Sequence, residues 1–478
     1  MFESIPRHAP ALLLGAVLGL LGGCSALPTN SGAEAVPSQE TAADDSIHEF
    51  RLDNGMQLIV KENHRAPVVV SQIWYRIGAS YEHIGITGIS HVLEHMMFKG
   101  TDKHPTGEFS RIIAENGGSE NALTGRDYTS YFQQLEKSRL PIAFELEADR
   151  MRHLQLPPAE FAKEVKVVME ERRMRTEDKP TALTYEEFMA TAFKVNPYHN
   201  PVIGWMDDLK HLKVQELEQW YRTWYSPNNA TLVVAGDVKP QEVLELAKRY
   251  FGGIKPSLLP EDKPRKEPEQ RGEQRITVKV QAELPLLLMG YKVPVLRTAE
   301  EPWKAYALEV LANVLDGGDS ARFSRELVRG EQLAASAGAG YDLLARHDSL
   351  LTLQGVPAQG RGIDELEVAL REQIDRLRET LVSKEELARI KAQVTAAKVY
   401  EMDSIFYQAM QLGMLETVGL DWREAGRYVE RINAITPEQV RQVAREFLHD
   451  ERLTVAVLDP LPLNTQSAAT REVNHAAH

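Results

Sequence analysis

The stretch SHVLEHMMFKGT, residues 90–101, carries two histidines, His91 and His95, with Glu94 between them. At 100° per residue, an α-helix places the histidines about 40° apart on one face, so both imidazole rings can reach a single ion. Glu94 lies about 60° to the other side of His91, still on that face. The pattern H-x-x-E-H is the reverse of the commoner zinc-binding pattern H-E-x-x-H. The stretch therefore predicts a helix that contributes two ligands to a metal site.

Imidazole groups suit Zn²⁺, and a catalytic zinc usually takes three protein ligands and one water molecule. Glu94 is then not needed as a ligand, and it is placed to take a proton from that water as a general base. A chain of 478 residues with 14 histidines contains this pattern by chance in roughly one case in thirty. The alternative is an amphipathic helix whose histidines only border a hydrophobic core.

A second predicted helix, residues 158–175, offers a third ligand. Glu164 and Glu171, seven residues apart, fall within the arc of this helix that its apolar side chains occupy. A carboxylate that faces a core needs a partner, and a metal ion is one. Arg172 and Arg175 fall within the same arc, so an ion pair is the alternative. The apolar residues that we expect on the buried arc are Phe161, Val165, Val167, Val168, Met169 and Met174.

Length and composition indicate a soluble globular protein of more than one domain. A chain of 478 residues exceeds what one hydrophobic core ordinarily supports. Hydrophobic residues make up 43% of the chain and charged residues 26%, as in ordinary globular proteins. The net charge of −14 argues against binding to nucleic acid.

Residues 1–23 have the pattern of an export signal, because Arg7 precedes an apolar run that is too short to span a bilayer comfortably. The run ends in LGGC, which resembles the signal of bacterial lipoproteins, whose cysteine, here Cys24, is lipidated after cleavage. Cys24 is the only cysteine of the chain, so an intramolecular disulfide is excluded. The alternative is an ordinary signal peptide with an incidental cysteine.

Several acyl chains on Cys24 would hold the protein firmly on a membrane. Ser25, rather than an aspartate, follows the cysteine, as in lipoproteins that are sorted to the outer membrane. We therefore expect a lipid-anchored protein of the bacterial cell envelope that faces the periplasm, at the outer rather than the inner membrane. Residues 24–46 are small and polar and are predicted to form a flexible tether.

The folded part is predicted to consist of two similar halves, residues 47–253 and 276–460, joined by a linker at 254–275. Each half has strands and then helices, which indicates an α+β fold built by internal duplication. In the second half, a predicted helix at 303–315 takes the place of the histidine-bearing helix but contains no histidine. We therefore expect one metal site, and we expect residues 461–478 to be disordered.

Local patterns give the predicted elements. The turn Asp53-Asn54-Gly55 between two strands predicts a hairpin. The residues from Arg126 onward alternate as in a strand, which is either an edge strand that can pair with an extended peptide or an ordinary internal strand. Further strands are predicted at 49–52, 56–61, 68–77, 230–237, 276–280, 284–292, 350–353 and 453–458, and helices at 214–225, 240–251, 365–382, 384–413 and 437–448.

Together these residues resemble the pitrilysin superfamily of zinc peptidases, which includes insulin-degrading enzyme and mitochondrial processing peptidase. The resemblance runs from about residue 47 to 460. It rests on HVLEH at 91–95 with FKGT at 98–101, on Asn121-Ala122 with Thr124 and Asp127, on Glu164 with Glu171, and on YSPNNA to GDV at 225–238.

The resemblance implies a zinc site and a fold. One Zn²⁺ per chain is held by His91, His95 and Glu171, since the family's third ligand lies 76 residues after the second histidine. Glu94 is then the general base, and Glu164 is a supporting acidic residue. The implied fold has two homologous halves, each a mostly antiparallel sheet with helices packed on one face, which form a substrate chamber with a partner.

The resemblance also implies how substrate and partner are engaged. Asn121 and Ala122 belong to the edge strand that holds the substrate backbone. Active single-chain and homodimeric members carry an Arg and, seven residues later, a Tyr in the second half, which anchor the substrate and stabilise the oxyanion. Val328 and Ala335 stand at these positions here. The pattern resembles the split members, such as the beta subunit of mitochondrial processing peptidase, in which a zinc-less subunit supplies the missing pair.

We therefore expect the zinc-bearing subunit of a heterodimer whose homologous, zinc-less partner bears the Arg and the Tyr. The expected activity is that of a zinc metalloendopeptidase acting on short or unfolded peptides, because an enclosed chamber excludes folded proteins. Two alternatives stay open. One is a catalytically silent structural or chaperone-like subunit of the same fold, and the other is a zinc-dependent binding module at the membrane.

Overall fold

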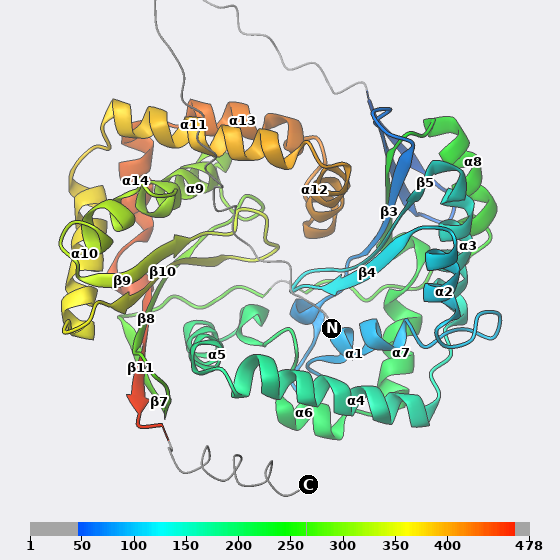
Figure 1. Cartoon of the computed structure of the whole chain (residues 1–478), viewed down its shortest axis with the longest axis horizontal. Coiled ribbons are helices and arrows are strands. Elements are labelled where there is room, and N and C mark those ends of the chain that lie inside the picture. The colour runs from blue at the N-terminus through cyan, green and yellow to red at the C-terminus, as the bar shows by residue number, and fades with distance from the viewer. Residues whose placement is uncertain (1–45, 264, 464–478) are drawn as a thin grey trace, which may run out of the picture. The chain divides into compact units, whose positions relative to one another are not determined.

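The computed structural model describes residues 46–263 and 265–463, which are organised around two β-sheets (Figure 1). The first sheet contains β1 (Ile47–Arg51), β2 (Gln57–Glu62), β3 (Val68–Tyr75), β4 (Ser119–Thr124), β5 (Thr129–Glu136) and β6 (Ala230–Gly236). The second sheet contains β7 (Gln274–Gln281), β8 (Leu286–Val293), β9 (Ala334–Gly340), β10 (Ser349–Pro357) and β11 (Leu453–Leu461).

The two sheets share one plan. Their strand orders are β1-β2-β6-β3-β5-β4 and β7-β11-β8-β10-β9. Neighbouring strands are antiparallel except for the pairs β2–β6 and β7–β11, which are parallel. The prediction of an α+β fold with two mostly antiparallel sheets is therefore confirmed.

Helices separate and cover the strands. Those of the first half are α1 (Ile89–Met96), α2 (Glu108–Glu115), α3 (Leu140–His153), α4 (Pro158–Arg172), α5 (Pro180–Ala192), α6 (Met206–His211), α7 (Val214–Trp224) and α8 (Pro240–Phe251). Those of the second half are α9 (Pro302–Asp316), α10 (Ile363–Glu379), α11 (Lys384–Glu401), α12 (Ile405–Val418), α13 (Glu424–Ala434) and α14 (Pro437–Phe447). None of these described helices has the length and apolar character needed to cross a membrane. The predicted lipidation site Cys24 and the predicted signal peptide lie outside the described residues.

Both faces of the first sheet are buried, which explains why β3 is apolar almost throughout. Val69, Ile73 and Tyr75 lie in the core that the sheet forms with α1, α3 and α8. Val70 and Trp74, which point to the opposite face, lie in a second core formed with α12. The implied arrangement, with helices on one face only, is therefore incomplete, because one helix from the second half covers the other face.

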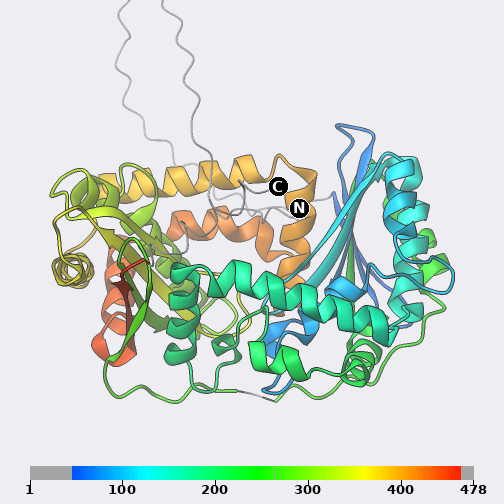
Figure 2. The same ribbon diagram turned by 60° about the horizontal axis from the view of Figure 1, so that its bottom comes forward.

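The two halves exchange helices. α12 of the second half packs on β3 and β6 of the first sheet, and α5 of the first half packs on β7, β8 and β11 of the second (Figures 1 and 2). Each contact includes an aromatic ring against a glycine. A Cβ added at Gly413 would lie 2.2 Å from Nε1 of Trp74, and a Cβ at Gly290 would lie 2.5 Å from the ring of Phe188. Glycine therefore permits the close packing of both exchanged helices.

Several local predictions are confirmed and others are wrong. The hairpin forms as β1 and β2, with Gly55 at a φ of 89° in its turn. The helix predicted at 384–413 is instead two helices, α11 and α12, with a break at 402–404. Strand β9 was not predicted, because AASAGAG lacks the branched and aromatic side chains that favour strands. The C-terminal disorder was predicted from residue 461, which instead ends β11.

Candidate metal centre

Helix α1 presents both predicted histidines, and its first turn is fixed by a buried carboxylate. The helix begins after Gly88, whose φ of 87° suits glycine, and no side chain of its own caps it. Glu82 instead accepts hydrogen bonds from the backbone N–H groups of Gly88 (2.7 Å) and Ser90 (2.8 Å). These bonds satisfy free N–H groups at the helix start, and a carboxylate there is favoured by the helix dipole.

His91, His95 and Glu171 come together between α1 and α4. Oε2 of Glu171 lies 3.7 Å from Nε2 of His91 and 3.5 Å from Nε2 of His95. One ligand atom from each residue lies within 4.8 Å of the others, and no other such group of three occurs among the described residues. Tetrahedral zinc with bonds of about 2.1 Å separates its ligand atoms by about 3.4 Å. The donor types and spacings therefore fit zinc.

Glu164 lies behind this group and orients one of its rings. Nδ1 of His95 lies 3.2 Å from Oε2 of Glu164, whose other oxygen pairs with Nζ of Lys99 at 2.6 Å. The Glu164 carboxylate favours the tautomer with the His95 proton on Nδ1, which would leave the Nε2 lone pair available to a metal ion. The structure thus places Glu164 in a supporting position rather than among the three ligand residues. Nδ1 of His91 is buried and has no hydrogen-bond partner among the described residues.

Burial and neighbouring charges shift the pKa values of the three groups in different directions. Burial, reinforced by the neighbouring His95, lowers the pKa of His91 to about 4, so His91 is neutral near pH 7. Burial also acts to lower the pKa of His95, but hydrogen bonds to Glu171 and Glu164 outweigh it and raise that pKa. Burial acts to raise the pKa of Glu171, whereas His95, His91 and Arg175 together lower it, so this carboxylate is ionised.

The alternative prediction, that an arginine rather than a metal ion is the partner of the inward-facing glutamate, is correct for one oxygen of Glu171. Arg175 pairs with Oε1 of Glu171, while Oε2 faces the two histidines. Arg172 is not involved, because it forms two 2.7 Å hydrogen bonds with Glu186. Glu171 therefore has one oxygen for the cationic side chain and one for a metal ion.

Glu94 lies beside the ligand group and is not part of it. Its Oε2 accepts a hydrogen bond of 2.5 Å from the hydroxyl of Thr124, the last residue of β4. Burial raises the pKa of Glu94, and the Thr124 hydrogen bond and the charge of His95 partly offset this. A raised pKa brings a carboxylate closer to the range useful for proton transfer near neutral pH. Thr124 is one of the motif residues, but no function was predicted for it from the sequence.

Asn121 and Ala122 lie on β4, which is the edge strand of the first sheet. The strand predicted from Arg126 onward is β5, which lies between β3 and β4 and is therefore internal. Oδ1 of Asn121 accepts a hydrogen bond from the backbone N–H of Ala122 at 2.8 Å. An open edge carries backbone groups that can pair with an extended peptide.

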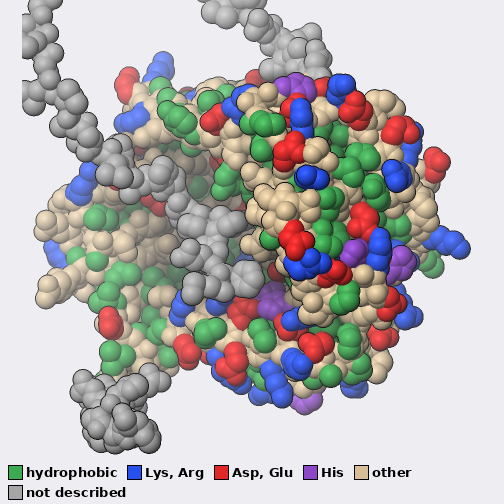
Figure 3. Space-filling model, turned by 45° about the vertical axis from the view of Figure 1, so that its right-hand side comes forward, with side chains coloured by type: hydrophobic (Ala, Val, Ile, Leu, Met, Phe, Trp, Pro, Cys, Tyr) green, Lys and Arg blue, Asp and Glu red, His purple; other side chains and the backbone are tan. Residues whose placement is uncertain are grey.

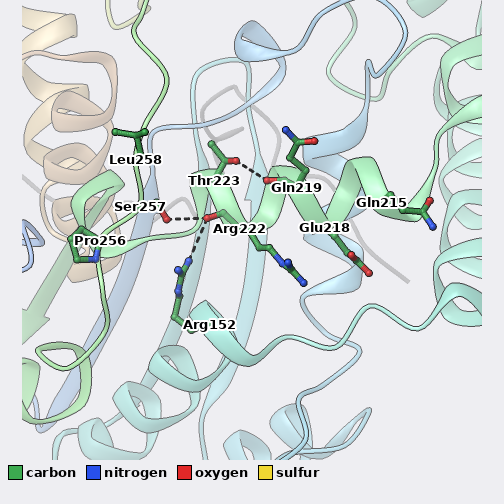
Figure 4. A pocket seen from close by; sticks show the side chains of 9 residues that line it. All are labelled: Arg152, Gln215, Glu218, Gln219, Arg222, Thr223, Pro256, Ser257 and Leu258. Atoms are coloured by element: carbon green, nitrogen blue, oxygen red, sulfur yellow. Dashed lines mark hydrogen bonds between the residues drawn. The ribbon is translucent and has the colours of Figure 1, made fainter.

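A surface pocket of about 410 Å³ lies elsewhere, along α7 and the chain that follows α8 (Figure 4). Arg152 donates hydrogen bonds to the carbonyl oxygens of Arg222 and Tyr225, so its guanidinium is already engaged. The pocket shares no residue with the metal-ligand group. Its lining consists of Arg152, Gln215, Glu218, Gln219, Arg222, Thr223, Pro256, Ser257 and Leu258.

The surface drawn in Figure 3 shows acidic and basic side chains interspersed, with no continuous basic stripe on that face. The net charge of the chain is −14. Binding to the phosphate backbone of a nucleic acid requires clustered Lys and Arg side chains. The face shown offers no such cluster.

Comparisons with known proteins agree with the geometry. Residues 57–205 match the family model for insulinase (peptidase family M16), and residues 211–394 match the model for the peptidase M16 inactive domain. The chain is 35% identical to the zinc protease PqqE of Helicobacter pylori over 66% of this chain and 71% of that protein. It is 26% identical to the uncharacterized zinc protease YmxG of Bacillus subtilis over 87% and 98% of the two chains.

Solved structures show the same fold. The crystal structure of a protease from Helicobacter pylori has a TM-score of 0.81 at 29% identity and covers 87% of this chain and 99% of that chain. A peptidase M16 inactive domain from Pseudomonas fluorescens has a TM-score of 0.78 at 14% identity, with 87% and 100% covered, which shows the fold alone. With the family models and the relative at 35% identity, these likenesses establish that the chain belongs to the M16 (insulinase, or pitrilysin) family.

Proposed function

We propose that this protein is a zinc metalloendopeptidase that hydrolyses peptide bonds in short or unfolded peptides. The observation that carries the proposal is the convergence of His91, His95 and Glu171 beside a half-buried carboxylate, Glu94. Two imidazoles, one carboxylate and an adjacent base are the donor set of a catalytic rather than a structural zinc. The M16 relatives named zinc proteases support the same chemistry.

In the proposed reaction, His91, His95 and Glu171 would hold one Zn²⁺ per chain. Bound there, zinc would act as a Lewis acid toward the scissile carbonyl. Glu94 accepts a proton from the attacking water and passes it to the leaving amine. Glu164 keeps the ring of His95 in the ligand orientation. The backbone of β4 at Asn121 and Ala122 would hold the peptide extended beside these groups.

We further propose that the oxyanion donors come from a homologous, zinc-less partner. Val328 ends the short helix η6 (Phe323–Val328), and Ala335 lies on β9, the edge strand of the second sheet. Neither side chain can donate a hydrogen bond. The partner would supply an Arg and a Tyr, and each donor is worth roughly 3 kcal/mol in the barrier.

The setting that we propose is the bacterial cell envelope. Lipidation of Cys24 would anchor the protein on a membrane facing the periplasm, at the outer rather than the inner membrane. The alternative, a catalytically silent subunit, receives less support. The inactive-domain match at 211–394 extends into the second half, whose helix α9 carries no histidine, whereas the first half has the whole ligand set.

The decisive experiment compares Glu94→Gln with wild type, each alone and after co-expression with a homologue that lacks H-x-x-E-H. We expect the assembled wild type to cleave an unstructured peptide and to hold one zinc. Glu94→Gln should hold the same zinc and lose activity by about 10²- to 10⁴-fold, as expected when a general base is removed. Metal content is measured by elemental analysis and cleavage by mass spectrometry.

The matched control is Glu170→Gln, since Glu170 precedes the ligand Glu171 but is exposed and pairs with Arg173. This variant should keep both zinc and activity. Full activity of the chain alone would overturn the split-site proposal. Loss of zinc in Glu94→Gln, or unchanged activity in it, would overturn the role of Glu94.

A further inference from the structure

Thr124 belongs to the motif at residues 121–127, but none of the roles assigned so far involves its side chain. Its hydroxyl donates a 2.5 Å hydrogen bond to Oε2 of Glu94, and no other hydrogen bond to this carboxylate exists among the described residues. We infer that Thr124 is a positioning residue that orients the general base and ties it to the edge strand β4. The inference rests on the proposed function and adds a residue to it.

The position of the Thr124 hydroxyl is fixed by the chain on both sides. Thr124 is paired with Thr129 at the end of the β4–β5 ladder. The turn that follows is closed by a hydrogen bond from the N–H of Gly125 to the carbonyl of Tyr128 at 2.8 Å. The carbonyl oxygens of Gly125 and Arg126 accept hydrogen bonds from the N–H groups of Ala79 and Ser80, at 3.2 and 2.7 Å. The backbone that carries the donor is thus held by hydrogen bonds on both sides of Thr124.

Glu94 needs such a donor because its own side chain has three rotatable bonds. A single bond to Oε2 selects one rotamer and leaves Oε1 free to accept a proton. Loss of the hydroxyl should therefore affect proton transfer more than substrate binding.

The same hydroxyl links the base to the strand proposed to hold the substrate. Ala122 and Thr124 are two residues apart on β4, so their side chains lie on the same face of the sheet, whereas the backbone edge faces outward. A peptide paired with this edge would fix the strand that carries the donor. Binding of the peptide and orientation of Glu94 then depend on one short segment, residues 121–124.

The test uses three variants in the assembled, zinc-loaded enzyme. Thr124→Val keeps the shape and removes the hydroxyl, and Thr124→Ser keeps the hydroxyl. Thr101→Val is the matched control, because Thr101 also donates a 2.5 Å hydrogen bond to a carboxylate, that of Asp149. We expect Thr124→Val to lower kcat by about 10- to 100-fold, with KM within about twofold and zinc content unchanged. Thr124→Ser and Thr101→Val should retain kcat within about threefold.

A crystal structure of Thr124→Val supplies a readout that does not depend on activity. We expect the Glu94 carboxylate to leave its wild-type position, while His91 and His95 stay in place. An unmoved carboxylate, an unchanged kcat, or an equal loss in Thr124→Ser would overturn the inference. If the wild type binds zinc but cleaves no peptide, the proposed function fails, and the position of Glu94 in the crystal still decides whether Thr124 orients it.

Discussion

Glu82 is a fully buried carboxylate whose charge state bears on the stability of α1, the helix that carries His91 and His95. Burial raises its pKa from 4.5 to about 7, and hydrogen bonds from Ser90 and Gly88 offset this only in part. Between pH 4.5 and 7, the unfolded chain releases a proton that the folded chain keeps. The contribution of Glu82 to stability is therefore complete below pH 4.5, declines as the pH rises, and is lost above pH 7.

We predict that Glu82→Gln removes this pH dependence. The variant should be less stable than wild type at pH 5, because one of its side-chain atoms can no longer accept a backbone N–H. From pH 5 to pH 8 the advantage of the wild type should shrink by up to roughly 3 kcal/mol. Urea unfolding of both proteins at several pH values measures the difference. Glu187→Gln, at an exposed carboxylate on α5, should show no such trend; a constant difference for Glu82→Gln would contradict the prediction.

At the scale of residues, helix periodicity predicted well where the helix is regular. The spacing of His91 and His95 fixed their shared face, and the placement of Glu171 on an inward arc matches its position in the structure. Val167 and Met174 were predicted on the buried arc but are 47% and 61% exposed. Val167 lies at the margin of the arc, and Met174 lies beyond α4 in the wider turns of a π-helix, where 100° per residue no longer applies.

At the scale of elements, α12 packs closely on the first sheet because Gly413 has no side chain at the point of contact. Gly413 lies in the middle of α12, where glycine normally weakens a helix by about 0.5–1 kcal/mol relative to alanine. The ring of Trp74 occupies the space that a Cβ would take. The packing of α12 on β3 thus outweighs the helix propensity at this position.

We predict opposite effects for two glycine-to-alanine changes in neighbouring helices. Gly413→Ala should lower the free energy of unfolding by about 1–3 kcal/mol, because the new methyl group forces Trp74 or the helix to move. Gly426→Ala on α13 should raise it by about 0.5–1 kcal/mol, since a Cβ there meets no atom within 4 Å. Chemical denaturation measures both. A stabilised Gly413→Ala variant would show that the space between Gly413 and Trp74 accommodates a methyl group.

Elements with a strong period or a clear boundary were predicted, and elements defined by tertiary contacts were not. α8 was predicted with its observed ends, because Pro240 starts it and glycine follows Phe251. β9 is a strand only because β10 pairs with it, and its small residues give no pattern. The apolar residues of α12 predict a buried helix, but they do not indicate that it packs on the first sheet rather than the second.

At the scale of the whole molecule, a buried polar group of residues joins the two halves near the edge strand. Asp127, just after β4, accepts hydrogen bonds from the hydroxyl of Ser80 (2.7 Å), the N–H of Arg346 (3.1 Å) and the hydroxyl of Tyr198. The Tyr198 oxygen in turn accepts from the N–H groups of Arg346 (2.9 Å) and His347 (3.2 Å). One phenol therefore links a carboxylate of the first half to the backbone of the second.

We predict that Tyr198→Phe loosens this link without unfolding either half. The amides of Arg346 and His347 lose their shared acceptor, at a cost of about 1–3 kcal/mol, and should exchange with deuterium faster. Tyr131→Phe removes a buried hydroxyl whose hydrogen bond among the described residues is to Tyr225, within the first half, so it should leave those two amides unchanged. Equal protection of the amides in Tyr198→Phe and wild type would show that Asp127 alone maintains the link.

The sequence was sufficient to predict two halves and the convergence of His91, His95 and Glu171, because duplication and motif spacing are properties of the chain order. The junction between the halves was not predictable, since Asp127 and Arg346 lie 219 residues apart and no periodicity connects them. Glu82 was missed for a similar reason: it reaches the start of α1 across a loop rather than along a helix face.

Because α5 and α12 each pack on the sheet of the other half, the arrangement resembles a domain swap within one chain. If the first half were made alone, the sheet face that α12 covers would be exposed to water. If the second half were made alone, the sheet face that α5 covers would be exposed. A break in the backbone between α8 and β7 would thus yield two fragments that we expect to be recovered as a pair. The packing of the two exchanged helices, in addition to the covalent linker, therefore holds the halves together.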